Sequence, residues 1–265
     1  MYRLKDWIPL NKLDMALLSA NPNAIHLLEQ FPDQIDWREL STNPNAIHLL
    51  RHIHWCELSS NPSAISILEQ NIPLICWHKL SSNPNAISLL EKYPEYIDWR
   101  ELSMNPNAIH LLDKNIPLIY WRELSSNPNA IHLLERYPDK IDWAELSANP
   151  KAVHLLEKNP DKIVWSELSH NPNAIHLLEQ SPDKIDWTWL SLNPNATHLF
   201  PDNVDKLNWI CLSDNINAVE MFKLYPKDWS WAWLSSNPSI FEYDYESMRQ
   251  NRHPLKMELL NLFLI

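Results

Sequence analysis

The sequence predicts an all-α fold: an α-solenoid of about eleven 22-residue repeats, each with two short helices, and a cap at either end. Two columns of residues support this prediction. The dipeptide Asn-Pro recurs every 22 residues, with one shorter spacing of 18 between Asn43 and Asn61. Tryptophan recurs in the same register from Trp37 to Trp231, and Met15 holds its place in the first copy. The asparagine column is Asn21, Asn43, Asn61, Asn83, Asn105, Asn127, Asn149, Asn171, Asn193, Asn215 (followed by isoleucine) and Asn237.

The longer helix of each copy is predicted to begin at Asn-Pro. Asparagine is a favoured N-cap and proline a favoured first helical residue, so Asn149-Pro150 would start this helix in one typical copy. Apolar residues spaced as on one helical face follow the proline. In the same copy this face is Ala152, Val153, Leu155 and Leu156.

A second, shorter helix is predicted to begin near the tryptophan. Asp142 and Glu145 have the spacing of a capping box, which predicts a helix of about a turn and a half, with partial 3₁₀ character. We expect Trp143 and Leu146 to join the core, and Ser147 to bond to backbone near the helix end.

Helices this short depend on their neighbours, because isolated helices need roughly 12–15 residues. Each copy should therefore pack on the next, and with helix layers about 8–10 Å apart eleven copies would form a rod or arc roughly 100 Å long. The connection at 51–54 is four residues shorter than its equivalents. It predicts a tight turn and a local offset in the stack.

The whole chain, 1–265, is predicted to be a single solenoid domain. It divides into an N-terminal cap (1–12), the repeats (13–238) and a C-terminal cap (239–265). Caps are needed because the terminal repeats of a solenoid would otherwise expose an apolar edge. The final residues, Leu262-Phe263-Leu264-Ile265, are expected to pack on the last repeat or to contact a second molecule.

Composition narrows the functional classes. The net charge is −11 and glycine is absent, which argues against nucleic-acid binding and against glycine-rich nucleotide loops. Cys56, Cys76 and Cys211 form no C-x-x-C pair, as is typical of a reducing compartment. No signal-peptide or membrane-span pattern occurs, so we expect a cytoplasmic protein without a membrane partner.

Three repeated polar columns could carry chemistry, but each is better explained structurally. Equivalent residues of successive repeats lie about 8–10 Å apart, so the histidines cannot share a metal ion. The regular glutamates and serines suit capping and local hydrogen bonds, because catalysis needs one special place. We therefore predict no enzymatic activity, no cofactor and no metal site. The histidine column is His26, His48, His110, His132, His154, His176 and His198.

Additional tryptophans near the C-terminus could form an aromatic platform for sugars or bases. Trp189, Trp229 and Trp233 are the tryptophans of this region that lie outside the repeated column. We expect them to stack within the C-terminal core.

Two columns vary while their neighbours repeat: the residue after the tryptophan and the residue before Asn-Pro. In stacked repeats such positions line an extended surface on which a partner lies. Arg100 and Arg122, one repeat apart and beside Met104, are the strongest candidates for a contact patch. The full candidate partner surface is Arg38, His78, Arg100, Met104, Arg122 and His170.

A leucine-rich-repeat horseshoe is the alternative fold, because 22 residues lies within its range of 20–29. Its pattern L-x-x-L-x-L-x-x-N fails here, since asparagine follows Trp143-x-x-Leu146 two places early and is itself followed by proline. An Asn-Pro cap also favours a helix where the horseshoe has a strand.

The repeat Trp-x-Glu-Leu-Ser-x-Asn-Pro-Asn-Ala-Ile-His-Leu-Leu resembles repeat proteins that giant DNA viruses of amoebae and algae encode in many copies. The likeness covers residues 13 to about 245 and includes Phe241-Glu242-Tyr243-Asp244-Tyr245, which is similar to that family's terminal element. The connection at 51–54 and the short tail after Asn251 depart from the family pattern. The resemblance implies a viral protein, in the host cytoplasm or in the virion, and no catalytic residues.

Two functions fit these observations. The first is a non-enzymatic scaffold that binds a protein partner, such as a host factor, through an extended solenoid surface. The alternative is a structural or assembly component of a viral particle or larger complex. We expect a monomer, or weak self-association through the C-terminal end.

Overall fold

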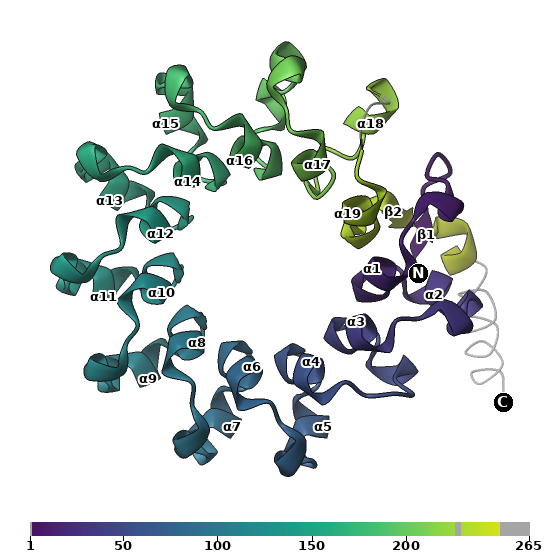
Figure 1. The fold of residues 1–265 in the computed structure, drawn as a ribbon, viewed down its shortest axis with the longest axis horizontal. Coiled ribbons are helices and arrows are strands. Elements are labelled where there is room, and N and C mark those ends of the chain that lie inside the picture. The colour runs from purple at the N-terminus through teal and green to yellow at the C-terminus, as the bar shows by residue number, and fades with distance from the viewer. Residues whose placement is uncertain (1, 226–228, 250–265) are drawn as a thin grey trace, which may run out of the picture.

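The computed structural model describes residues 2–225 and 229–249. It confirms the predicted all-α repeat architecture, with an inner circle of short helices surrounded by an outer circle (Figure 1). Within these residues the only strands are β1 (Tyr2–Leu4) and β2 (Phe241–Tyr243), close to the two ends. The horseshoe alternative is therefore wrong, because it needs a strand in every repeat.

Each repeat contributes one inner helix, which begins at the tryptophan or, in the first repeat, at Met15. The leucine at its fourth position is completely buried in every repeat, and burial of such a side chain stabilises the fold by about 1.5–3 kcal/mol. The inner helices are α1 (Met15–Ala20), α3 (Trp37–Thr42), α4 (Trp55–Ser60), α6 (Trp77–Ser82), α8 (Trp99–Met104), α10 (Trp121–Ser126), α12 (Trp143–Ala148), α14 (Trp165–His170), α16 (Trp187–Leu192), α17 (Trp209–Leu212) and α19 (Trp231–Ser236).

The outer layer holds the second helix of each repeat and the connection that follows it. The outer helices are α2 (Ile25–Gln30), α5 (Ile65–Glu69), α7 (Ile87–Lys92), α9 (Ile109–Lys114), α11 (Ile131–Arg136), α13 (Val153–Lys158), α15 (Ile175–Gln180) and α18 (Met221–Leu224). Single 3₁₀ turns replace this helix at Ile47–Leu49 and Thr197–Leu199. Further 3₁₀ turns form connections at Pro32–Gln34, Ile72–Leu74, Pro94–Tyr96, Ile116–Leu118, Pro138–Lys140, Pro160–Lys162, Pro182–Lys184 and Pro201–Lys206, and flank the end segments at Leu10–Lys12 and Pro238–Ile240.

The aspartate cap is confirmed, but the complete capping box is not. Asp142 accepts hydrogen bonds from the backbone N–H groups of Ala144 and Glu145, both at 3.1 Å. The N–H of Asp142 itself donates to the Ser125 hydroxyl of the preceding repeat at 3.0 Å. The glutamate is therefore not needed as the reciprocal cap, and it is available for an ion pair.

The prediction that asparagine caps the longer helix is wrong. Asn149 ends the inner helix, where its N–H donates to the Leu146 carbonyl, and its Oδ1 accepts from the N–H of Lys151 at 3.0 Å. The outer helix begins at Val153, and Ala152 stands at its N-cap position. Asn-Pro thus forms a turn between the two helices, a role for which asparagine is also favoured.

The asparagine side chain joins successive repeats. Nδ2 of Asn149 donates to the carbonyls of Ser125 at 2.9 Å and Asn127 at 3.1 Å, both in the preceding repeat. All eleven asparagines of the column are buried and make the same pair of bonds. We call this continuous set of bonds the asparagine ladder.

The ladder closes on itself. Asn21 in the first repeat donates to the carbonyls of Ser235 at 2.9 Å and Asn237 at 3.1 Å, in the last repeat. The N–H of Asp14 donates to the Ser235 hydroxyl at 2.8 Å, and helices α1 and α19 are neighbours (Figure 1). The expected rod or arc is therefore wrong, because the eleven repeats form a closed ring.

The predicted caps also differ from expectation, since the two end segments pair with each other. Strands β1 and β2 are antiparallel, with Arg3 opposite Glu242 and an ion pair of 2.7 Å between their side chains. The Lys5 ammonium lies 2.5 Å from the Glu220 carboxylate. The predicted packing of the Leu262–Ile265 run falls outside the described residues.

The short connection at 51–54 does not displace the stack. Asn61 makes the usual ladder bonds to the carbonyls of Ser41 and Asn43, and the N–H of His54 donates to the Ser41 hydroxyl at 3.1 Å. The expected offset is absent from the inner layer, because the missing residues are taken from the outer layer, where the single 3₁₀ turn Ile47–Leu49 is not followed by a second turn before Trp55.

Candidate functional site: the inner face of the ring

Helical periodicity determines which residues face the centre of the ring. At about 100° per residue, the first, fourth and fifth positions of an inner helix share the side that packs on the outer layer. These positions hold the tryptophan, the buried leucine and the buried serine. The second, third and sixth positions lie on the opposite side and point inward, since the inner helices line the ring (Figure 1). We call these three positions in all eleven inner helices the inner face.

From α3 to α14 the inner face carries charged residues, which we call the charged arc. Arginines at the second position pair with a glutamate at the third position of the next helix. The Arg100 side chain lies 2.6 Å from Glu123, and that of Arg122 lies 3.1 Å from Glu145. Glutamate recurs at the third position in Glu39, Glu57, Glu101, Glu123, Glu145 and Glu167, and lysine replaces it once at Lys79.

His78 bridges two acidic groups of the next repeat. Its Nδ1 lies 3.0 Å from Asp98 and its Nε2 lies 3.7 Å from Glu101. Burial favours a raised pKa for Asp98, but the His78 hydrogen bond and the backbone N–H groups of Glu101 and Arg100 outweigh it. The pKa of Asp98 is therefore lower than usual, and this carboxylate remains charged at neutral pH.

From α16 through α17 and α19 to α1 the third position of the inner face becomes apolar, and we call this part the apolar arc. The third position changes from glutamate to Trp189, Cys211, Trp233 and Leu17. Trp189 is 40% exposed, Ile210 55% and Trp233 53%. Exposed apolar side chains of this size on three successive inner helices favour a surface that binds a partner. The inner face is therefore divided into one charged and one apolar part.

All six residues of the candidate partner surface lie on the inner face and are exposed. They are distributed over five inner helices rather than gathered in one patch, and their arginines are paired with glutamates. Met104 is 47% exposed, and the His170 ring lies 6.0 Å from that of Trp189, at the boundary between the arcs. The six are Arg38 in α3, His78 in α6, Arg100 and Met104 in α8, Arg122 in α10 and His170 in α14.

The sequence interpretation missed the apolar arc. Trp229 packs as expected, with its ring 4.6 Å from that of Phe222. Trp189 and Trp233 do not stack in the core, because the third position of an inner helix faces the ring centre. Both tryptophans occupy the third position, where most other repeats have glutamate. This shared register is the feature of the sequence that indicates their exposure.

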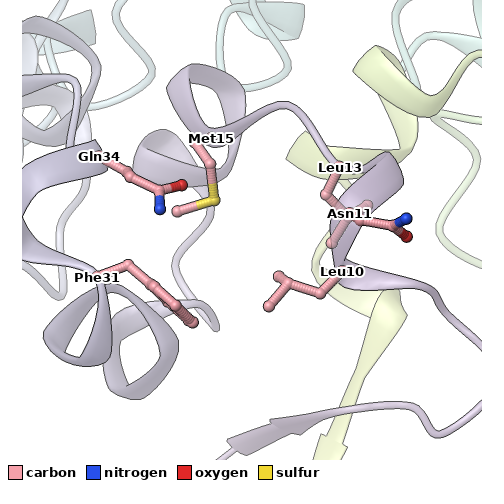
Figure 2. Close-up of a pocket in the computed structure, with 6 residues that line it drawn as sticks. All are labelled: Leu10, Asn11, Leu13, Met15, Phe31 and Gln34. Carbon is pink, nitrogen blue, oxygen red and sulfur yellow. The ribbon is translucent and has the colours of Figure 1, made fainter.

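A cavity of about 390 Å³ lies beside the first repeat (Figure 2). It exists where Met15 replaces the tryptophan of other repeats, and Leu10, Leu13 and Phe31 supply most of its lining. Asn11 and Gln34 are its polar residues, so the lining provides no acid, base or nucleophile. This cavity gives no support to a catalytic site.

The histidine column lies in the outer layer, and six of its seven members lie within 4 Å of a glutamate. The Nε2 atoms of His110, His176 and His198 each lie 3.0 Å from a glutamate of the preceding repeat. Across 2–225 and 229–249, no group of three histidine, cysteine or acidic residues is arranged to hold a metal ion. The serines at the fifth position of the inner helices are buried. Each serine hydroxyl donates to the backbone carbonyl of the first residue of the same helix.

No helix among the described residues is long and apolar enough to cross a membrane. Comparisons of the chain with protein-family models, with curated proteins and with solved structures found no match. The inner face, with its charged and apolar arcs, is accordingly the candidate site that the structure itself defines.

Proposed function

We propose that this protein is a non-enzymatic scaffold that binds a segment of a protein partner within its ring, against the inner face. One observation carries the proposal: on the inner helices, the two positions that vary most between repeats, the second and the sixth, lie on the inner face, while the repeated tryptophan, leucine and serine face the outer layer. Repeat proteins use extended concave surfaces of this kind to bind partners.

The dimensions of the ring support a polypeptide ligand. With about 8–10 Å between neighbouring helices, eleven inner helices define a circle roughly 100 Å around, or ~16 Å in radius at the helix axes. Subtracting about 5–6 Å for the half-width of a helix leaves an opening ~20 Å across, and a single α-helix is about 10–12 Å wide. The opening therefore admits one helix or one extended segment.

The two arcs specify the chemistry of the partner. Its apolar side would contact Trp189, Ile210 and Trp233, and a charged side would face the charged arc. At its second and third positions that arc holds six glutamates and four basic residues, which are Arg38, Lys79, Arg100 and Arg122. The net charge of −11 disfavours nucleic acid. We further propose, from the resemblance of the repeat, that the partner is met in the cytoplasm of a virus-infected host.

Affinity capture with matched variants tests this proposal. The wild-type ring, Trp189→Ala/Trp233→Ala and Leu74→Ala/Leu118→Ala are used as bait in extracts of infected cells, after circular dichroism confirms that all three fold. Leu74 and Leu118 are exposed apolar residues of the outer layer, so they control for the loss of apolar surface. We expect proteins captured by the wild type and the outer variant to be reduced at least tenfold on the inner variant. Equal capture by all three would contradict the proposal.

Assembly into a larger body is the second candidate function, and the outer layer supplies an observation for it. Leu74, Tyr96 and Leu118 are exposed apolar residues in three successive connections, each 44–51% exposed. If they join copies of the ring, sedimentation should show oligomers that grow with concentration and that Leu74→Ala/Leu118→Ala removes. Removal of 259–265 separately tests self-association through the C-terminal end.

A further inference from the structure

Two cysteines of successive repeats lie in direct contact on the inner layer. The Sγ atoms of Cys56 and Cys76 are 2.8 Å apart, although the residues are 20 positions apart in the chain. Cys56 is the second residue of α4 and is exposed, and Cys76 immediately precedes α6. Both are free thiols in this structure.

The repeat geometry, rather than chance placement of two side chains, brings these positions together. At the following interface the same two positions hold His78 and Asp98, whose Nδ1 and Oδ2 atoms lie 3.0 Å apart. The backbone before each inner helix is fixed by the serine of the preceding repeat, here by the bond from the Cys76 N–H to the Ser59 hydroxyl at 3.0 Å. The thiols are therefore held facing each other.

We propose that Cys56 and Cys76 form a dithiol–disulfide site, which a disulfide such as glutathione disulfide oxidises to an intrachain bond linking α4 to α6. One cysteine thiolate attacks glutathione disulfide, forming a mixed disulfide and releasing one glutathione thiolate. The second cysteine thiolate attacks the protein sulfur of that mixed disulfide and releases the other glutathione. Two protein thiols and one glutathione disulfide thus give one protein disulfide and two glutathione molecules, which take up the two protons.

A metal ion does not explain the pair as well. Structural sites for soft metals such as zinc use four ligands, and no third histidine, cysteine or acidic side chain joins this pair within the described chain. Cys211 lies in α17, six inner helices beyond α6, and serves as a cysteine that the pair cannot reach.

The pair should react slowly near neutral pH. The hydrogen bond with the Cys76 thiol, together with burial and nearby charge, raises the pKa of Cys56 to about 11. Since the thiolate is the reactive form, oxidation should accelerate as the pH rises. This behaviour differs from that of a low-pKa catalytic cysteine.

Peptide mapping tests the proposal, which does not depend on partner binding. The full chain is treated with glutathione disulfide at pH 8.5, free thiols are alkylated, and a glutamate-specific protease cleaves it. Cleavage after glutamate places Cys56 in peptide 40–57 and Cys76 in peptide 70–91. We expect these two peptides to be joined, Cys211 to be alkylated, and dithiothreitol to separate the pair.

Two further measurements make the test decisive. The wild type should need at least tenfold less glutathione disulfide in buffer than in denaturing urea, because the folded ring holds the thiols together. The closed loop of 20 residues should raise the Tm by roughly 5–10 °C, a shift absent from Cys56→Ser and Cys76→Ser. Glutathione adducts on all three cysteines without a joined peptide, or links between chains only, would overturn the proposal.

Discussion

At the scale of single residues, each buried asparagine of the ladder both ends an inner helix and links neighbouring repeats. Asn127 accepts a bond from the N–H of Asn129 in its own turn and donates Nδ2 to the carbonyls of Ser103 and Asn105 in the preceding repeat. Its own carbonyl accepts from Nδ2 of Asn149 in the following repeat. One residue therefore joins three repeats, which explains why its column is retained while the exposed columns vary.

Replacement of Asn127 by aspartate should be strongly destabilising. The carboxylate cannot donate to the Ser103 and Asn105 carbonyls and would place an unpaired charge in a buried site. We expect the free energy of unfolding to fall by at least about 3 kcal/mol, measured by urea denaturation.

The matched control is the neighbouring residue Asn129. It is exposed, and its Nδ2 bond to the Pro106 carbonyl is absent from the repeat in which Ser63 holds the same position. Asn129→Ser should therefore lower the free energy of unfolding by no more than about 1 kcal/mol. A similar loss for both variants would show that the ladder has no special role.

At the scale of elements, the inner layer is uniform and the outer layer is adaptable. The residue before every inner helix donates its N–H to the serine hydroxyl of the preceding repeat, although the residue type at this position changes. The outer helix, in contrast, is replaced by a 3₁₀ turn at Ile47–Leu49 and Thr197–Leu199. The inner helices carry the ladder, so a changed length there would break bonds on both sides. The outer segments pack mainly through apolar contacts, which tolerate changes of length.

Insertion experiments separate these two layers. Four residues added within 51–54 would restore the common repeat length, and we expect the free energy of unfolding to change by less than about 1 kcal/mol. One alanine added between Glu57 and Leu58 would rotate the rest of α4 by about 100° and remove Leu58 and Ser59 from their buried positions. Thermal melts followed by circular dichroism should show a normal transition for the first variant and loss of cooperative unfolding for the second.

The sequence was sufficient to predict these elements but not every role within them. The period, the two layers of short helices and the aspartate cap follow from residue spacing, and the structure confirms them. Asn149 was assigned to the wrong helix because asparagine is favoured both at N-caps and in turns. Trp189 was assigned to the core because composition does not reveal which side of a short helix faces a ring.

At the scale of the whole molecule, closure of the ring depends on the angle between successive repeats. The residues of a single repeat do not specify that angle. Each repeat places one short helix inside and a helix with its connection outside, so it is wedge-shaped. Eleven wedges close a circle only if each turns the chain by about 33°, a small angle that stacking geometry determines. Lys5, Glu220 and the β1–β2 pair then join the ends.

Energy transfer between the two ends tests ring closure, which is the central claim, most directly. Cysteines replacing Arg3 and Glu242, in a chain whose natural cysteines are serines, carry a donor and an acceptor dye on facing strand residues. A closed ring predicts transfer near its maximum in buffer and a loss of transfer in urea. Asn21→Asp, which removes the closing bonds to Ser235 and Asn237, should lower transfer in buffer. Transfer near zero in the folded protein, as expected for an open stack with ends roughly 100 Å apart, would contradict the closed ring.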